Sequence, residues 1–233
     1  TRISKESKAS RPAARRRPSR AVPERPAARR RSAAGAAPYH HGDLREALIA
    51  SATEMIEAGG PSSFTLRECA RRAGVSHAAP KNHFATAEDL IAEVAARGFE
   101  HFVAALAQAA DSSVDQSPDA RLTAMCRAYV DFARSHRGVY GLMFRERSGF
   151  AKSEHLRTAA RAAWEQLHRS VAAVTGPGRG DTDAKAAHVW SLVHGIASLT
   201  IDRRFPEIID PEAVIATSVA SLPAAIRSVG PAR

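Results

Sequence analysis

The segment from Phe64 to Phe84, FTLRECARRAGVSHAAPKNHF, determines the expected fold. Thr65 precedes an apolar-periodic run and Glu68 follows three residues later, which is the spacing of a capping box at a helix start. Gly74 is placed to end that helix with a positive φ, and Ser76 is placed to cap a second helix. Two short helices joined by a glycine-centred turn are the arrangement that presents a helix to the major groove of DNA.

This segment resembles the DNA-binding half of the TetR family of bacterial transcriptional regulators. The resemblance is carried by Thr65, Ala73, Gly74, Val75, Ser76, His83 and Phe84. It extends upstream, because residues 42 to 60 have apolar side chains at helical spacing and match the family's first helix. Those side chains are Leu44, Leu48, Ile49, Ala52, Met55 and Ile56. The chain departs from the family pattern at Lys81, which follows Pro80 where an aromatic residue is usual, and at Ala87, where a basic residue is usual.

The cap expected at Ser76 indicates which residues meet the bases. His77, Ala78 and Ala79 would then form the first turn of the second helix, where side chains approach base edges. The alanine methyl groups suit the methyl group of thymine, and His77 can donate or accept a hydrogen bond. Direct readout is therefore expected to be sparse, with groove shape contributing to specificity.

The following residues are expected on the face nearest the DNA backbone. Lys81, Asn82 and His83 lie on this face, and the resemblance implies that Lys81 and His83 contact phosphates, together with Thr65 at the start of the preceding helix. For His83 the alternative is a local hydrogen bond that fixes the turn before Phe84. For Lys81 the alternative is a solvated side chain with no DNA contact.

The first 38 residues carry the net charge of the protein. The whole chain has 34 Lys and Arg against 24 Asp and Glu, and residues 1–38 contain 12 of the basic and 2 of the acidic residues, which leaves 22 of each for the remainder. This tail has few large apolar side chains, so we expect it to be disordered. We interpret it as an arm that contacts phosphates through Arg29, Arg30 and Arg31. The alternative is a solubilising extension without fixed contacts.

Beyond the tail, the apolar residues predict an all-α fold with about nine helices. They recur at spacings of three and four and do not alternate as in strands. The predicted helical spans are 43–58, 65–73, 77–83, 87–110, 119–136, 138–147, 153–175, 182–203 and 211–228. We expect a three-helix helix-turn-helix domain over residues 39–86 and a larger helical domain for ligand binding and dimerisation over residues 87–228. The long helix from Ala87 would link the two, so that a shift at its far end re-aims the DNA-binding head.

Two of the predicted helices, 119–136 and 138–147, carry aromatic and methionine side chains in stripes. Such stripes are typical of a hydrophobic core, but the resemblance implies that the corresponding helices enclose a small-molecule cavity, for which adaptable apolar side chains are suited. The predicted pocket residues are Tyr129, Phe132, Tyr140, Met143, Phe144, Trp164, Trp190 and His194.

The motif Trp-x-x-x-His-Gly at residues 190–195 is similar to the signature of one subclass of TetR C-terminal domains. Trp190 and His194 are four residues apart and therefore lie on one helix face. His194 can be interpreted in two ways, as a ligand-binding group or as a hydrogen-bonded core residue.

The helix predicted over 182–203 is apolar around much of its circumference, which indicates a second buried face and hence a partner. The resemblance implies that this helix and the last one build a homodimer, as a four-helix bundle about a two-fold axis. The predicted interface residues are Val189, Ile196, Leu199, Val214, Val219 and Leu222. A two-fold dimer implies a palindromic operator, with recognition helices about 34 Å apart or a multiple of it.

These features favour a DNA-binding regulator: a repressor that a small apolar or amphipathic ligand releases from its operator. Activation in place of repression stays open, and the alternative function is an architectural, non-specific DNA-binding protein that uses the Arg-rich tail. An enzyme is not expected, because the sequence has no Gly-x-Ser-x-Gly motif, phosphate loop or paired carboxylates. No Cys/His cluster has zinc spacing, so neither a metal nor a cofactor is expected. Two cysteines within helical patterns favour a cytoplasmic protein without disulfides, and no apolar run is long enough for a membrane span.

Overall fold

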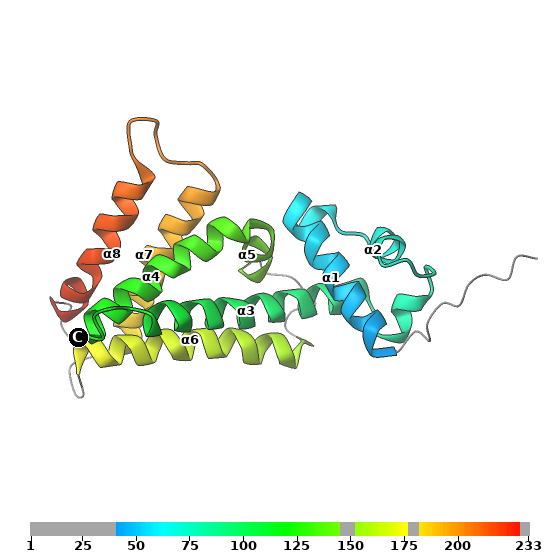
Figure 1. Ribbon diagram of the computed structural model, residues 1–233, viewed down its shortest axis with the longest axis horizontal. Coiled ribbons are helices and arrows are strands. Elements are labelled where there is room, and N and C mark those ends of the chain that lie inside the picture. Colours follow the sequence, from blue (N-terminus) through cyan, green and yellow to red (C-terminus); the bar gives the residue numbers. More distant parts are fainter. Residues whose placement is uncertain (1–40, 145–151, 177–181, 229–233) are drawn as a thin grey trace, which may run out of the picture. The chain divides into compact units, whose positions relative to one another are not determined.

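The computed structural model describes residues 41–144, 152–176 and 182–228, and these residues form helices without strands. They contain eight α-helices and two short 3-10 segments (Figure 1). The α-helices are α1 (His41–Gly59), α2 (Leu66–Arg72), α3 (Ala87–Asp111), α4 (Pro118–Ser135), α5 (Arg137–Met143), α6 (Glu154–Thr175), α7 (Thr182–Ile201) and α8 (Pro211–Ser228), and the 3-10 segments are η1 (Pro61–Ser63) and η2 (Ala79–Asn82). The basic tail with Arg29, Arg30 and Arg31, and the end of the helix predicted at 138–147, lie outside the described residues.

Eight of the nine predicted helices are present, but the ninth, at 77–83, is not an α-helix. A turn at residues 77–78 leads into η2, whose hydrogen bonds span three residues: Ala79 N donates to Ser76 O at 3.0 Å and Lys81 N to Ala78 O at 3.2 Å. Pro80 has no N–H to donate and disfavours the α conformation at the residue before it. The cap position is Ala78, with no side-chain hydrogen bond, so the prediction that Ser76 caps this element is wrong.

The two residues expected to start α2 play the predicted roles in part. Thr65 Oγ1 accepts a hydrogen bond from Glu68 N at 3.3 Å, as a capping residue should. The Glu68 carboxylate does not reach back to the backbone; it binds two arginines of its own helix. The complete capping box lies one helix later, where Thr86 and Asp89 exchange hydrogen bonds and start α3. Gly74 has a φ of 70°, which the turn after α2 requires.

The long helix α3 is the centre of the structure. It lies side by side with α6 and packs against α4, while α7 and α8 pack on α4 from the other side (Figure 1). Its buried residues run from Leu90 near its first turn to Ala110 near its last. The same helix also contacts α1. One continuous core therefore extends from the helix-turn-helix segment into the larger helical part.

A second contact between these parts is formed by the short helix α5 on the end of α1. Gly138 donates its backbone N–H to Glu57 Oε2 at 2.9 Å. A Cβ at residue 138 would overlap the carbonyl oxygen of Ile56 and lie 2.7 Å from the Cα of Glu57. The two helices therefore meet backbone to backbone at a position that only glycine fits.

Candidate functional site

The segment expected to read DNA is exposed in the structure. Thr65, Ser76, His77, Ala78, Lys81 and Asn82 are exposed, whereas Ala79 and His83 are half-buried. The buried members of the segment are Pro80 and Phe84, which hold it against the core. The N-terminal end of the segment is therefore accessible, as DNA contact requires.

The charges beside this segment are arranged in two groups. Glu68 binds Arg71 in a bidentate pair, with Nε to Oε2 at 2.7 Å and Nη2 to Oε1 at 2.6 Å, and also binds Arg72 at 3.0 Å. Hydrogen bonds from Arg71 and then Arg72 lower the pKa of the Glu68 carboxyl to about 2. Within the described part of the chain, the exposed Arg67 and Lys81 form no ion pair. These two cations are thus the ones available to phosphates without breaking a pair.

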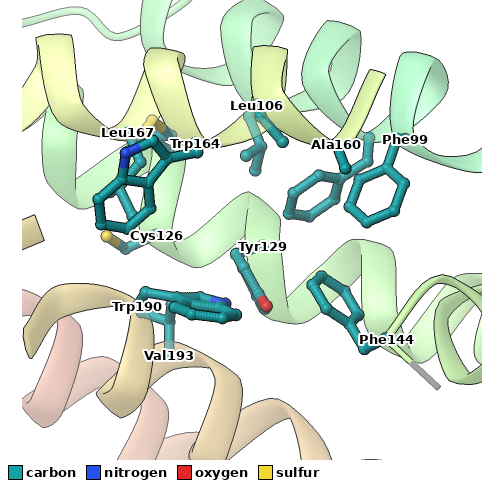
Figure 2. A pocket seen from close by; sticks show the side chains of 13 residues that line it. Phe99, Leu106, Cys126, Tyr129, Phe144, Ala160, Trp164, Leu167, Trp190 and Val193 are labelled. Carbon is teal, nitrogen blue, oxygen red and sulfur yellow. The ribbon is translucent and has the colours of Figure 1, made fainter. Parts of the chain in front are cut away.

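A cavity of about 250 Å³ lies between α3, α4, α6 and α7 (Figure 2). Of the predicted pocket residues, Tyr129, Phe144, Trp164 and Trp190 line it. Sequence reasoning missed the other lining residues, which are Phe99, Phe102, Leu106, Met125, Cys126, Ala160, Ala163, Leu167 and Val193. They belong to apolar helical stripes, and that pattern is the same for a packed core and for a cavity wall.

The other four predicted pocket residues lie behind the cavity wall, which corrects the prediction. Phe132 packs edge-on against Phe102, with ring centroids 5.2 Å apart. Met143 is buried against Gly98 of α3: a Cβ added at Gly98 would lie 3.0 Å from the Met143 sulfur. Tyr140 and His194 do not line the cavity but lie behind its wall, hydrogen-bonded to Tyr129 and packed on the Phe144 ring.

Tyr129, Tyr140 and His194 form a triangle of polar atoms at the cavity wall. His194 Nδ1 lies 2.9 Å from the Tyr129 hydroxyl and 2.8 Å from the Tyr140 hydroxyl. Tyr140 also donates to the Tyr129 oxygen at 3.2 Å. Burial lowers the pKa of His194, raises the pKa of Tyr140 to about 12 and raises that of Tyr129 further. The triangle is therefore uncharged at neutral pH.

The burial of His194 predicts a loss of stability on acidification. Because the pKa of His194 is lowered by burial, the unfolded chain takes up this proton before the folded chain as the pH falls below about 6.5. We expect the melting temperature of the native protein, relative to that of a His194→Asn variant, to fall between pH 7.5 and pH 5.5. The variant retains every other titrating group, so a difference that does not change with pH would contradict the assignment.

The predicted dimer residues are mostly core residues of the single chain. Val189, Ile196, Val219 and Leu222 are at most 5% exposed, so they have no surface to offer a partner. The apolar stripes of α7 and α8 are largely covered by packing on α4, on α6 and on each other. Of the six predicted residues, Leu199 is 42% exposed and Val214 is half-buried. The outer face of α8 consists of small side chains instead, including Ala213, Ala216, Ala220 and Ala224.

The described residues contain no group of three or more His, Cys, Asp and Glu side chains that could hold a metal ion. No helix among them has the length and apolar character needed to cross a membrane. Cys69 and Cys126 are buried and unpaired.

Two family profiles match the chain, and they fall on its two functional parts. Residues 48–94 match the profile of bacterial regulatory proteins of the tetR family, and this range contains the exposed segment that is expected to contact DNA. Residues 122–222 match the profile of the tetracyclin repressor-like C-terminal domain, and this range contains Tyr129, Tyr140 and His194. No curated protein matches the chain in sequence.

Three solved structures of similar fold come from Rhodococcus. A protein of unknown function from Rhodococcus sp. RHA1 is 32% identical, with 81% of this chain and 97% of that chain covered and a TM-score of 0.69. A regulatory protein of the tetR family from Rhodococcus RHA1 is 24% identical, with 82% and 98% covered and a TM-score of 0.56. A transcriptional regulator from Rhodococcus sp. Rha1 is 22% identical, with 78% and 95% covered and a TM-score of 0.60. With an exposed helix-turn-helix segment, a helical second part and family matches on both, the chain belongs to the TetR family of bacterial transcriptional regulators.

Proposed function

We propose that the protein is a homodimeric repressor that binds a palindromic operator and leaves it when a small apolar or amphipathic ligand enters the cavity of the C-terminal part. The observation that carries this proposal is the position of α5. Its first turn is fixed to α1 at Gly138, and Phe144 at its end lines the cavity. One short helix thus connects the ligand site to the DNA-binding head.

On the DNA side, the proposed contacts are the residues of the exposed segment and the start of α2. His77, Ala78 and Ala79 would face base edges, and Thr65, Ser76, Lys81, Asn82 and His83 would bind the backbone. Because Pro80 prevents an α-helical first turn, His77 and Ala78 lie on a turn and Ala79 lies at the start of η2. The proposed base contacts therefore do not come from the end of an α-helix. Arg67 joins this set, because its exposed guanidinium has no partner among the described side chains.

On the ligand side, the proposed response depends on two packings of the same helices. A ligand can shift the protein away from the DNA-binding state only if it binds that state less well than another. A ligand that displaces the Phe144 ring would move the end of α5, and the backbone contact of Gly138 with Ile56 would pass this movement to α1. The long helix α3 offers a second route, since Phe99 and Phe102 line the cavity on the helix that Thr86 caps.

The proposed dimer uses the outer faces of α7 and α8. These faces include the exposed Leu199 and the alanine-rich side of α8, which allow helices of two protomers to approach closely. In such a two-fold dimer, the exposed segments of the two protomers, each with His77, Ala78 and Ala79, would lie on the same face of the dimer. Their separation would be about one turn of DNA or a multiple of it. We further propose that the C-terminal part belongs to the TetR subclass with the Trp-x-x-x-His-Gly motif, which is supported by residues 190–195.

Footprinting on DNA fragments, including the region upstream of the protein's own gene, tests the proposed function. We expect one short protected palindrome that survives an excess of competitor DNA. Protection spread over any DNA, and lost to competitor, would favour the alternative of an architectural protein. The absence of sequence preference in every fragment would contradict the regulator.

Deletion of residues 1–33 tests the proposed arm. Arginines that neutralise phosphates release counterions, so each contact adds to the slope of log affinity against log salt. We expect the slope of the truncated protein to be smaller in magnitude by about 5, because a dimer loses six contacts at about 0.9 each if Arg29, Arg30 and Arg31 of both protomers each hold one phosphate. An unchanged slope between 50 and 200 mM salt would show that the tail does not contact DNA.

A further inference from the structure

The cavity wall limits the chemistry of its ligand. Of the described residues that line it, none carries a charged side chain, and the Cys126 thiol is kept neutral because burial raises its pKa to about 12. A carboxylate or an ammonium group inside would lose its water without gaining a counter-charge. The part of the ligand that enters is therefore uncharged.

The shape of the wall favours a flat molecule. Six aromatic side chains surround the cavity, and several meet edge to face: the Trp164 and Trp190 rings are 6.3 Å apart at 72°, and Phe102 and Tyr129 are 4.9 Å apart at 85°. Aromatic rings bind one another best in such offset or edge-to-face arrangements. An apolar cavity of roughly 150 Å³ holds benzene, so the larger volume of about 250 Å³ leaves room for a second ring or substituents.

Among the described residues that line the cavity, Tyr129 is the one with a hydroxyl group. Figure 2 shows it between the Trp190 and Phe144 rings. A neutral imidazole whose other nitrogen carries the proton has a single lone pair at Nδ1, so His194 can accept from only one of the two hydroxyls near it. Tyr140, at 2.8 Å, can satisfy His194 alone.

Tyr129 can therefore turn its O–H toward a ligand without leaving a buried acceptor unpaired. Because the single Tyr140 proton then goes to His194, the Tyr129 oxygen keeps the hydrogen bond with the Trp190 side chain. Moving the Tyr129 O–H from His194 to a ligand oxygen costs little free energy, because no buried polar atom is left without a hydrogen-bond partner. A ligand that lacks an acceptor at this position would leave the triangle as it is and gain nothing from it.

We propose that the cavity binds an uncharged aromatic molecule of about two rings that carries a hydrogen-bond-accepting oxygen, and that this oxygen receives the Tyr129 hydroxyl. The inference rests on the proposed function, because it names the ligand class of the same cavity. It does not depend on which operator the protein binds.

Three matched probes test the ligand class on the native protein. 2-Acetonaphthone, 2-isopropylnaphthalene and 2-naphthoate have the same ring system and the same number of non-hydrogen atoms, but carry a carbonyl oxygen, no acceptor and a negative charge, respectively. We expect calorimetry to give the tightest binding for the ketone, about tenfold weaker binding for the hydrocarbon and no detectable binding for the carboxylate. Equal affinities of the ketone and the hydrocarbon would contradict the proposed role of an accepting oxygen. Preferred binding of the carboxylate, or no binding of any probe, would contradict the proposed class of uncharged aromatic ligands.

The variant Tyr129→Phe tests the named hydrogen bond. It should weaken 2-acetonaphthone about tenfold and leave 2-isopropylnaphthalene unchanged. Both tryptophans of the chain line the cavity, so their fluorescence should change on ketone binding. An unchanged spectrum, or equal losses for both probes in the variant, would overturn the assignment. Release of the operator by the ketone is measured separately by gel shift: binding without release supports the ligand class and contradicts the proposed function.

Discussion

Replacing Gly138 by alanine should lower the free energy of unfolding by about 1–3 kcal/mol and weaken operator binding. Glycine-to-alanine changes within helices normally stabilise them. Here the new Cβ would overlap the Ile56 carbonyl oxygen and lie 2.7 Å from the Cα of Glu57. Backbone atoms cannot move out of the way by changing rotamer, as a long side chain can, so α5 and α1 must move apart. This separation strains the hydrogen bond from Gly138 N–H to the Glu57 carboxylate. Urea unfolding gives the loss of stability, and a gel shift gives the operator affinity.

Gly141 supplies the matched control on the same helix. A Cβ at Gly141 would meet nothing within 4 Å, so Gly141→Ala should be neutral or stabilising by up to about 1 kcal/mol. Equal stabilities of the two variants would show that α5 and α1 do not meet closely at Gly138. If Gly138→Ala is destabilised but binds and releases the operator like the native protein, then α5 does not transmit the ligand signal.

The features that could be predicted from the sequence depend on local chemistry. The last helix was expected at 211–228 and is α8, because Pro211 suits a first turn and the apolar residues keep helical spacing to its end. The Thr65 cap and the Gly74 turn follow from contacts within a few residues. Pro80 can also be seen in the sequence, and in an element as short as 77–83 its missing N–H leaves too few hydrogen bonds for the predicted α-helix.

The features that could not be predicted depend on three-dimensional packing. Phe99 and Leu106 line a cavity, whereas Leu90 on the same helix is fully buried in the core, and nothing in their spacing separates these outcomes. The apolar character of α7 on several sides suggests that Val189 and Ile196 are interface residues, but both are buried within one chain, where α7 packs on α4, α6 and α8. Gly138 gave no signal at all, since its role arises from Ile56, more than eighty residues earlier.

The variant Ala78→Asp should lower specific operator affinity by at least about 100-fold. Ala78 is exposed at the start of η2, in the middle of the proposed base-reading residues. A carboxylate there would be brought against phosphates and base edges, and like-charge contact in an interface costs several kcal/mol. Each dimer would carry the change twice. The fold should be unaffected, because Ala78 is exposed and its side chain makes no contact that the core depends on.

Ala104→Asp provides the matched control, because Ala104 is exposed on α3 and the substitution changes the net charge by the same amount. Comparing the two variants separates a local contact with DNA from a general loss of attraction to a polyanion, which would reduce both affinities alike. Gel shifts at one salt concentration give the affinities, and melting curves show whether both proteins are folded. If folded Ala78→Asp binds the operator within a few-fold of Ala104→Asp, the exposed segment around Ala78 is not the surface that reads DNA, and the operator must be bound through another face of the protein.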